Sequence, residues 1–280
     1  MEIIKDVRQM HERAMDIRCS DETLGFVPTM GALHDGHISL VRQCVNDNDI
    51  SVVSVFVNPS QFAPGEDFDK YPRTEEKDTL ILENEDCDIL FMPDRRDMYF
   101  NHLTTVRVEG ITEKLCGEKR PGHFEGVATI VSKLFNIIMP QKAYFGKKDY
   151  QQYIVMRKMV FDLNFNVEII GCPVVRESDG LAMSSRNAYL KPAHRKTAPA
   201  LYRELKRGRD LLLEGMPPER VLEEMQNRLK DIKDLKVDYI DILTGSTLQV
   251  PSENDKHLRI FAAVYIGETR LIDNIGVELE

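Results

Sequence analysis

Two histidines, His34 and His37, close a segment that reads Phe-Val-Pro-Thr-Met-Gly-Ala-Leu-His-Asp-Gly-His over residues 26–37. Imidazole N–H groups can donate hydrogen bonds to phosphate oxygens, and to the charge that develops as a phosphate bond breaks. A His-x-x-His pair on a loop is more often incidental, and as a metal site it would need further ligands. Its position favours the phosphate interpretation, because the pair lies after a strand-like run, inside a glycine loop and at the start of a helical pattern.

The elements around the two histidines are a predicted strand, loop and helix. Residues 23–27 form a short β-type run, and Pro28 is expected to end it because proline cannot donate to a sheet ladder. Gly31 and Gly36 permit a tight loop close to a ligand. From Ser39 the apolar spacing becomes helical, at Leu40, Val41, Cys44 and Val45. A helix N-terminus binds phosphate well, through its N–H groups and its dipole.

Two more polar segments follow strand-like runs. The β-branched run 51–57 is typical of a buried parallel strand, and Gln61 lies in the turn that comes after it. A short run at 143–145 opens into Gly-Lys-Lys-Asp at 146–149. Because open α/β sheets bind ligands at the carboxyl ends of their strands, we expect these segments to share one edge of the sheet with the loop at 29–37, called here the histidine loop.

Positive charge and hydroxyl groups come from Lys148 and from Met-Ser-Ser-Arg-Asn at 183–187. Arg186 can hold a phosphate with two parallel hydrogen bonds, whereas a lysine acts as a point charge. Ser184 and Ser185 add hydroxyl donors, and Asp149 suits the hydroxyl groups of a ribose. Taken singly, a Lys-Lys pair or a Ser-Ser-Arg tripeptide is more often a solvated surface. The combination is what indicates a nucleotide site.

The remaining pattern alternates helices and strands as far as about residue 176. Helices are predicted at 3–18, 75–84, 124–139 and 150–163, and strands at 88–92, 104–108 and 167–175. This alternation predicts a doubly wound parallel sheet in a domain spanning residues 1–176. A smaller α+β domain, 177–280, follows, with a helix at 193–213, another from Pro217, and antiparallel strands at 237–243, 258–266 and 270–275.

Composition excludes several classes of function. The net charge of −9 and the pI near 5.4 argue against a nucleic-acid binder, which should carry a basic surface. Five cysteines without a Cys-x-x-Cys motif favour free thiols in a reducing compartment. No apolar run approaches the roughly 18 residues of a membrane span, and the charged N-terminus is unlike a secretion signal. We therefore expect a cytoplasmic protein with no nucleic-acid or membrane partner.

Six blocks in this order give the chain a close resemblance to the pantothenate synthetase family over nearly its full length. The blocks are Pro-Thr-Met-Gly-Ala-Leu-His-Asp-Gly-His at 28–37, Phe-Val-Asn-Pro-Ser-Gln-Phe at 56–62, Tyr-Pro-Arg-Thr at 71–74, Arg-Pro-Gly-His-Phe-Glu-Gly-Val at 120–127, Phe-Gly-Lys-Lys-Asp-Tyr-Gln-Gln at 145–152 and Asp-Gly-Leu-Ala-Met-Ser-Ser-Arg-Asn at 179–187. Members of this family join pantoate to β-alanine with ATP. Lys147 stands where the family often has an acidic residue.

The resemblance implies a Rossmann-like α/β fold of the nucleotidyltransferase type, a C-terminal lid domain and a homodimer. It assigns a proton-donor role to His37, puts pantoate on Gln61 and Gln152 with β-alanine near Gln61, and requires Mg²⁺, with Asp78 as the carboxylate beside it. The other catalytic residues that we expect are His34, Lys148 and Arg186. The ATP contacts that it implies are Met30, Gly31, Ala32, Leu33, His34, Asp35, Gly36, His37, Gly146, Lys147, Lys148, Asp149, Val175, Met183, Ser184, Ser185 and Arg186.

The family reaction also makes chemical sense for these residues. Attack of the pantoate carboxylate on the α-phosphate of ATP gives an acyl adenylate, and the amine of β-alanine then displaces AMP. Two readings compete with it. A related nucleotidyltransferase, such as a tRNA synthetase fragment, would need a basic surface. A nucleotide sensor that has lost catalysis would be expected to lack some of the histidine, lysine or Ser-Ser-Arg positions.

Overall fold

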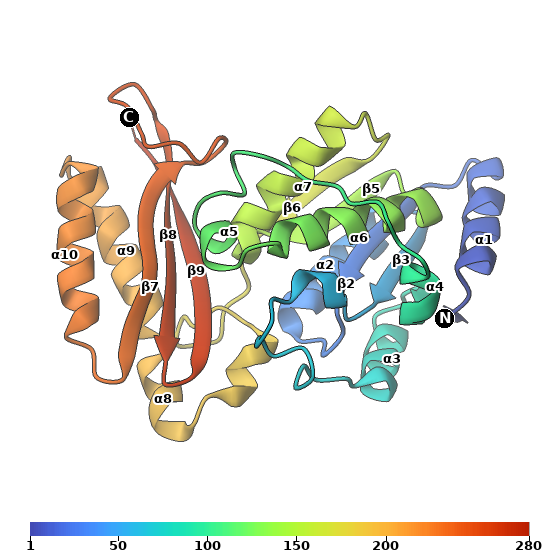
Figure 1. Ribbon diagram of the computed structural model, residues 1–280, viewed down its shortest axis with the longest axis horizontal. Helices are drawn as coiled ribbons and strands as arrows, with labels where there is room; N and C mark the ends of the chain where they lie inside the picture. Colours follow the sequence, from blue (N-terminus) through green and yellow to red (C-terminus); the bar gives the residue numbers. More distant parts are fainter. Residues whose placement is uncertain (280) are drawn as a thin grey trace. The chain divides into compact units, whose positions relative to one another are not determined.

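The computed structural model describes residues 1–279, which pack into two compact units (Figure 1). The N-terminal unit comprises Met1–Lys147 and Gln151–Pro173. The C-terminal unit comprises the rest of the described chain from Val174, together with the three residues Lys148–Tyr150. The sequence places the boundary three residues later, between 176 and 177, and gives no sign that Lys148 packs with the C-terminal unit.

The N-terminal unit alternates strands and helices. Its strands are β1 (Glu2–Ile4), β2 (Leu24–Thr29), β3 (Ile50–Val55), β4 (Ile89–Phe91), β5 (Lys142–Gly146) and β6 (Glu168–Cys172). Its helices are α1 (Val7–Cys19), α2 (Asp35–Asp47), α3 (Glu75–Asn84), α4 (Arg95–Tyr99), α5 (Cys116–Lys119), α6 (His123–Ile138) and α7 (Tyr150–Asp162), with 3₁₀ turns η1 (Pro59–Gln61) and η2 (Lys147–Asp149). The predicted helix at 3–18 is wrong at its start, because β1 occupies its first residues.

The six strands form one sheet in the order β1-β4-β3-β2-β5-β6, and every neighbouring pair is parallel. The chain runs from β2 to β3 in one direction and places β5 on the opposite side of β2. The order therefore reverses between β2 and β5, and such a reversal opens a crevice at the carboxyl ends of the two strands. β2 leads into the histidine loop there, and β5 ends at Gly146. This confirms the predicted α/β fold.

Pro28 does not end the second strand, as the sequence suggested, but lies inside it, paired with Ser54 of β3. The sides of β2 alternate: Thr29 accepts a hydrogen bond from Phe56 on the β3 side, whereas Leu24 accepts one from Gln141 on the β5 side. The nitrogen of Pro28 thus faces β5. The pairing of β2 with β5 covers only Gly25 and Phe26, so no ladder hydrogen bond is lost there.

Both faces of this sheet are covered by helices. On one face, the ring of Phe26 meets that of Phe135 on α6 edge-on, with 6.4 Å between centroids. On the other face, Val27 packs in a buried cluster with Leu40 and Val41 of α2. Adjacent residues of one strand thus point into two separate cores, which is why β2 and β3 read as continuous apolar runs and not as alternating ones.

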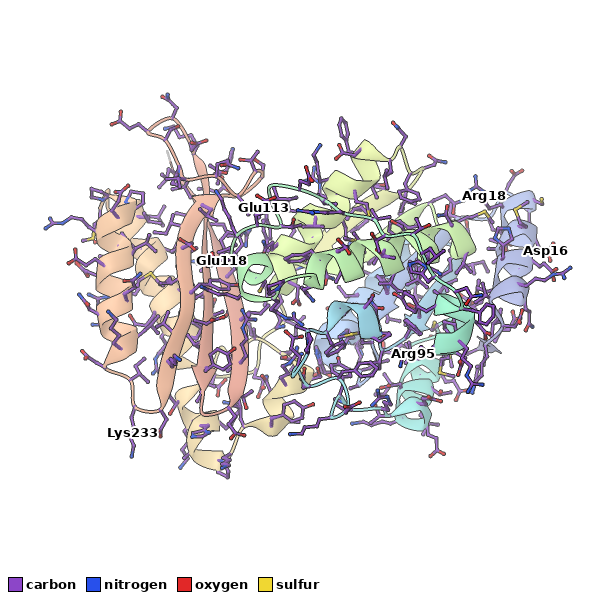
Figure 2. The ribbon with its side chains drawn as sticks, in the orientation of Figure 1. Asp16, Arg18, Arg95, Glu113, Glu118 and Lys233 are labelled. Atoms are coloured by element: carbon purple, nitrogen blue, oxygen red, sulfur yellow. The ribbon has the colours of Figure 1, made fainter. Side chains whose placement is uncertain are left out.

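One predicted strand of this unit, at 104–108, is wrong. The segment has no regular structure, because the backbone N–H of Val106 donates to the hydroxyl of Thr129 on α6 and not to another strand. Helix α1 shows the expected amphipathic pattern: Met10, Ala14 and Ile17 are buried, while Asp16 and Arg18 are exposed (Figure 2). No helix within residues 1–279 is long and apolar enough to cross a membrane.

The C-terminal unit is an antiparallel sheet of β7 (Leu235–Thr244), β8 (His257–Ile266) and β9 (Thr269–Glu278), with a turn at Gly267 between the last two. Helices α9 (Ala200–Leu213) and α10 (Pro218–Lys230) pack against it, preceded by η3 (Ser185–Tyr189) and α8 (Pro192–Thr197). The single helix predicted at 193–213 is wrong, because it breaks where Pro199 supplies no N–H for the helical ladder.

Candidate functional site

The histidine loop begins where β2 ends, and Thr29 fixes its first turn. The Thr29 hydroxyl donates to the carbonyl of Ser54 at 2.7 Å and accepts the N–H of Gly31 at 3.1 Å. Gly31 and Ala32 both have positive φ, +78° and +51°, which turns the chain sharply toward α2. The glycine that the sequence marked as a loop residue is therefore required by the backbone conformation.

His34 is the N-cap of α2, and this role fixes the position of its proton. Its Nδ1 accepts the backbone N–H of Gly36 at 3.1 Å, so Nδ1 holds a lone pair and the neutral ring carries hydrogen on Nε2. The ring of His37, in the first turn of the helix, lies 4.1 Å from the ring of His34, centroid to centroid. The structure therefore brings both predicted imidazoles together at a helix N-terminus, where the dipole favours an anion.

Gln61 lies in η1, after β3, and its side chain is oriented by Asn58 and Met30. Its Oε1 accepts from Asn58 Nδ2 at 3.1 Å, and its Nε2 lies 2.9 Å from the sulfur of Met30. Asn58 is itself 1 % exposed and receives a 2.6 Å hydrogen bond from the hydroxyl of Tyr99. Sequence reasoning did not single out Asn58 or Tyr99, although Asn58 stands in a matched block directly before Pro59.

A second set of contacts holds the backbone of Gln61. His123 Nδ1 lies 2.8 Å from the Gln61 carbonyl, and His123 Nε2 lies 3.1 Å from the guanidinium of Arg120. Arginine can only donate and a carbonyl can only accept, so the ring is neutral with hydrogen on Nδ1. Arg120 also forms two 2.7 Å hydrogen bonds to the carboxylate of Glu66. This chain of contacts ties η1 to the start of α6.

The two glutamines at the start of α7 differ. Gln152, expected to bind pantoate, is half-buried. Gln151 is buried and serves the fold: its amide donates to the carbonyls of Ile111 and Lys114 at 2.8 Å each, and it accepts the N–H of Cys116 at 3.0 Å. Of the pair, Gln152 is thus the one whose side chain is not used to hold the segment that precedes α6.

Asp78, expected beside Mg²⁺, is completely buried in the first turn of α3. Its two carboxylate oxygens accept the backbone N–H groups of Ala32 at 2.9 Å and Leu33 at 2.8 Å. Its role as a metal ligand stays a prediction. No group of three His, Cys, Asp or Glu side chains in residues 1–279 is arranged to hold a metal ion.

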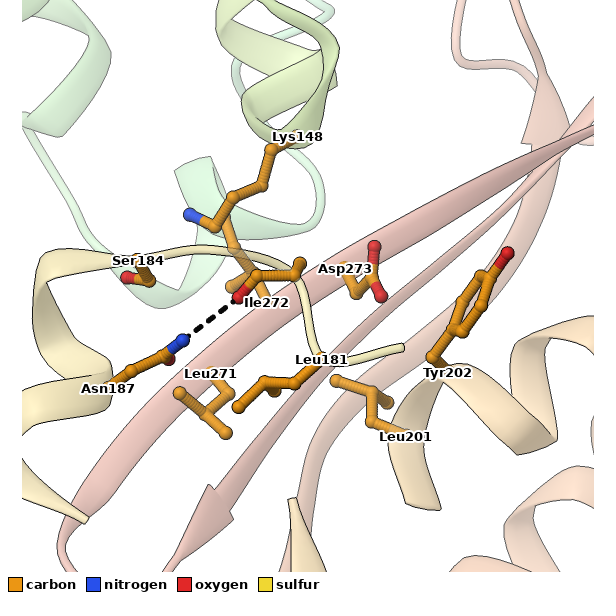
Figure 3. A pocket seen from close by; sticks show the side chains of 10 residues that line it. Lys148, Leu181, Ser184, Asn187, Leu201, Tyr202, Leu271, Ile272 and Asp273 are labelled. Carbon is orange, nitrogen blue, oxygen red and sulfur yellow. Dashed lines mark hydrogen bonds between the residues drawn. The ribbon is translucent and has the colours of Figure 1, made fainter. Parts of the chain in front are cut away.

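Lys148 is held within the C-terminal unit, where it lines a small pocket with Ser184, Asn187 and Asp273 (Figure 3). The cavity is about 10 Å³, roughly the room for one water molecule. The backbone carbonyl of Lys148 accepts a hydrogen bond from Asn274 Nδ2 at 2.8 Å. The lysine and the first serine of the Ser-Ser-Arg motif are therefore neighbours, as the nucleotide hypothesis requires.

Hydrogen bonds hold the segment with the Ser-Ser-Arg motif before and within the motif. Val175 accepts the N–H of Met183 at 3.0 Å, and the Ser184 hydroxyl caps η3 by accepting the N–H of Arg186 at 3.3 Å. Beside Val175, Arg176 forms two hydrogen bonds of 2.6 and 2.9 Å to the buried carboxylate of Asp273. The same guanidinium lies 3.5 Å from the ring centroid of Tyr202. Arg176 and Asp273 were missed because they are far apart in the sequence.

The predicted site residues therefore form two groups, each arranged inside its own unit. The N-terminal unit carries the histidine loop, Gln61, Gln152, Gly146 and Lys147, and the C-terminal unit carries Lys148, Asp149, Val175 and the segment 183–186. The cysteines stand apart from both groups in their chemistry. Burial raises the pKa of Cys87 and of Cys172 to about 11, so neither is a thiolate nucleophile at neutral pH.

Comparisons with known proteins agree over nearly the full length of the chain. The family model described as Pantoate-beta-alanine ligase matches residues 2–276. A pantothenate synthetase from Thermodesulfovibrio yellowstonii is 50 % identical over 280 residues, covering 99 % of this chain and all of that protein.

Solved structures of pantothenate synthetases share the fold of this chain. The pantothenate synthetase of Thermus thermophilus superposes with a TM-score of 0.92 at 44 % identity, covering 98 % of this chain and 99 % of that one. A pantoate-β-alanine ligase from Francisella tularensis, complexed with β,γ-ATP and β-alanine, gives a TM-score of 0.82 at 37 % identity, covering 98 % of this chain and 97 % of that one. With the family profile, the sequence relatives and the fold in agreement, this chain belongs to the pantoate–β-alanine ligase family.

Proposed function

We propose that the protein joins pantoate to β-alanine with ATP, through a pantoyl adenylate, and releases AMP and pyrophosphate. The observation that carries this is the pair of imidazoles at the N-terminus of α2 in a chain of this family. Nucleotide binding is further supported by the Francisella tularensis relative, whose structure contains an ATP compound and β-alanine. The product would be pantothenate, the precursor of coenzyme A.

In the adenylation step, the pantoate carboxylate attacks the α-phosphate of ATP and pyrophosphate leaves. Negative charge grows on the phosphate oxygens during this attack. His37 and His34 lie where imidazole N–H groups and the helix dipole can stabilise that charge. In the His34 ring, the proton available for donation is the one on Nε2, because Nδ1 accepts from Gly36. Lys148 and Arg186 supply the positive charges that receive the pyrophosphate.

Pantoate is positioned by neutral amides. Gln61 and Gln152 can hydrogen-bond its hydroxyl groups and carboxylate without forming an ion pair, which would make the carboxylate a poorer nucleophile. Gln61 is well suited to this because Asn58, His123 and Arg120 fix both its side chain and its backbone. Rigid orientation of the reacting groups lowers the barrier by removing rotational freedom before the reaction. β-Alanine binds near Gln61 and attacks the acyl carbon.

Mg²⁺ enters with ATP in this proposal. The described residues 1–279 contain no ready cluster of three ligating side chains, and Mg²⁺ in phosphate-transfer sites is held largely by substrate phosphates and water. When bound, the ion would neutralise part of the phosphate charge. Adenylation of pantoate and the attack of β-alanine need no covalent enzyme intermediate. This agrees with the raised pKa values of the buried thiols of Cys87 and Cys172.

The proposal includes a cytoplasmic homodimer. All five cysteines are free thiols, which fits a reducing compartment. Light scattering on the purified protein should give a mass of twice the chain, and a monomer at micromolar concentration would contradict the dimer without affecting the proposed chemistry.

Pyrophosphate exchange tests the reaction itself. With ATP, Mg²⁺ and pantoate present and β-alanine absent, labelled pyrophosphate should enter ATP. Adenylation does not require the amine, and its reverse reaction returns pyrophosphate to ATP. Omitting pantoate is the control and should abolish exchange. Exchange that appears only after β-alanine is added would contradict the two-step route, and label transferred to the protein would contradict the absence of a covalent enzyme intermediate.

A further inference from the structure

Asp78 differs from the other acidic residues in the first turn of α3. Glu75 and Glu76 are exposed, whereas Asp78 has no exposed surface. Besides the N–H groups of Ala32 and Leu33, its carboxylate receives a 3.1 Å hydrogen bond from the Thr74 hydroxyl. A buried carboxylate is stable only when its oxygens accept hydrogen bonds. Here the residue pair 32–33 and Thr74 provide three donors.

The segment that Asp78 contacts has a backbone conformation that needs support. Gly31 and Ala32 are consecutive residues with positive φ, and alanine rarely adopts such a φ. The N–H groups of Ala32 and of Leu33, the residue that follows, converge on one carboxylate, as successive N–H groups of a concave backbone converge on an anion. A Cβ on Gly31 would lie 2.9 Å from Asp78 Oδ2 and 2.9 Å from a methyl of Val55, so the packing is close on both sides.

The supported segment leads directly into the site. Leu33 is followed by His34, the N-cap of α2, and His37 stands in the first turn. Any shift of the backbone at 32–33 therefore moves both imidazoles. We propose that Asp78 is a positioning residue that holds the Gly31–Leu33 backbone, and through it the two histidines, in the geometry that binds ATP, rather than a ligand of Mg²⁺.

Two features favour this role over metal binding. Both carboxylate oxygens already accept backbone N–H groups, which a metal ion would displace. The side chain is also fully buried, so a hydrated ion could reach it only after the loop had moved. The inference rests on the proposed function for its kinetic consequence, but its structural consequence can be measured without any activity.

Asp78→Asn tests the proposal, because an amide of nearly the same shape keeps one acceptor and turns a donor toward a backbone N–H. Hydrogen exchange measured by mass spectrometry should become at least about tenfold faster in the peptide covering residues 30–37, while peptides of the C-terminal unit are unchanged. The KM for ATP should rise by about tenfold, the KM for pantoate should stay within twofold, and the Mg²⁺ concentration for half-maximal rate at saturating ATP should not change.

Glu76→Gln, on the exposed side of the same helix, is the matched control and should behave as wild type in every measurement. An Asp78→Asn protein with wild-type exchange at residues 30–37 would overturn the proposal. So would a tenfold or greater rise in the Mg²⁺ requirement with an unchanged loop, since that is the behaviour of a lost metal ligand.

Thr74→Val keeps the proposal testable if Asp78→Asn fails to fold, because it removes one of the three hydrogen bonds and leaves the acid in place. It should speed exchange at residues 30–37 by a few-fold. Unchanged exchange would contradict the anchoring role. If wild-type protein shows no pyrophosphate exchange, the proposed function fails, yet the hydrogen-exchange comparison still decides whether Asp78 holds the loop.

Discussion

The side-chain amide of Asn274 donates a 2.8 Å hydrogen bond to the backbone carbonyl of Lys148, which joins two residues that are 126 positions apart. Asn274 is 3 % exposed, and its own oxygen accepts from Arg259. The guanidinium of Arg259 in turn lies 3.7 Å from the ring centroid of Tyr150. Strands β8 and β9 thus hold both ends of Lys148–Tyr150, which explains why these three residues pack with the C-terminal unit.

This relationship makes Asn274 important for the action of Lys148. Asn274→Ala should lower kcat for adenylation by about tenfold and leave the KM for pantoate unchanged, because it frees the lysine backbone and leaves a carbonyl without its partner. Stopped-flow or steady-state assays of AMP release would measure this. Glu278→Gln, at the exposed end of the same strand, is the control. A full rate in Asn274→Ala, together with an inactive Lys148→Ala, would show that the anchor is dispensable.

The two histidines should differ in their effect on stability. His37→Ala should slow adenylation by about 100-fold, with little change in melting temperature, because it removes one transition-state donor. His34→Ala should slow it as well, and should also reduce the free energy of unfolding by about 1 kcal/mol, because the ring caps α2 through Gly36. Calorimetry and pyrophosphate exchange provide the two readouts. His11→Ala, exposed on α1, is the control; normal turnover in His37→Ala would remove its assignment.

The glutamines should act on pantoate. Gln61→Ala and Gln152→Ala should each raise the KM for pantoate by about tenfold and change the KM for ATP less than twofold, because a lost polar contact costs about 1–2 kcal/mol of binding. Initial rates at varied pantoate and saturating ATP give the values. Gln226→Ala, exposed on α10, serves as the control. If the KM for ATP rose while that for pantoate stayed constant, the proposed division of the pocket would be wrong.

Stability should depend on pH through Glu66. Burial works to raise the pKa of Glu66, but the hydrogen bonds and charge of Arg120 outweigh it, so the folded-state pKa lies below its ordinary value of 4.5. A lowered folded pKa stabilises the protein above the unfolded pKa, and this stabilisation is lost as the pH falls through the folded pKa.

Glu66→Gln should therefore reduce the free energy of unfolding by about 1 kcal/mol at pH 7, and the difference from wild type should shrink progressively below about pH 4.5. Urea unfolding at pH 7, 5 and 4 would measure it. Glu118→Gln is the control, because the Glu118 side chain is 61 % exposed beside Lys119. A difference that stays constant across this range would mean that the ion pair with Arg120 does not set the pKa.

Local patterns were sufficient for much of this protein. The glycine at 31, the helical spacing after Ser39 and the β-branched run before Asn58 each depend on neighbours in the chain, and they predicted the strand-loop-helix unit around His34 and His37. The predicted helix at 75–84 matches α3 to the residue, and the antiparallel strands of the C-terminal unit were also predicted. The resemblance carried by six blocks predicted the family, because each block is a continuous stretch.

Relations between distant residues were decided only by the tertiary structure. Local pattern marked Pro28 as a strand end. Because β2 pairs with β5 only at Gly25 and Phe26, the missing N–H of Pro28 costs no hydrogen bond between these strands. No local pattern indicated that Asp78 accepts the backbone N–H groups of Ala32 and Leu33, which lie 46 and 45 positions earlier in the chain. The sequence could not pair Lys148 with Asn274, because a hydrogen bond between residues 126 positions apart depends on the packing of strands and not on any local pattern.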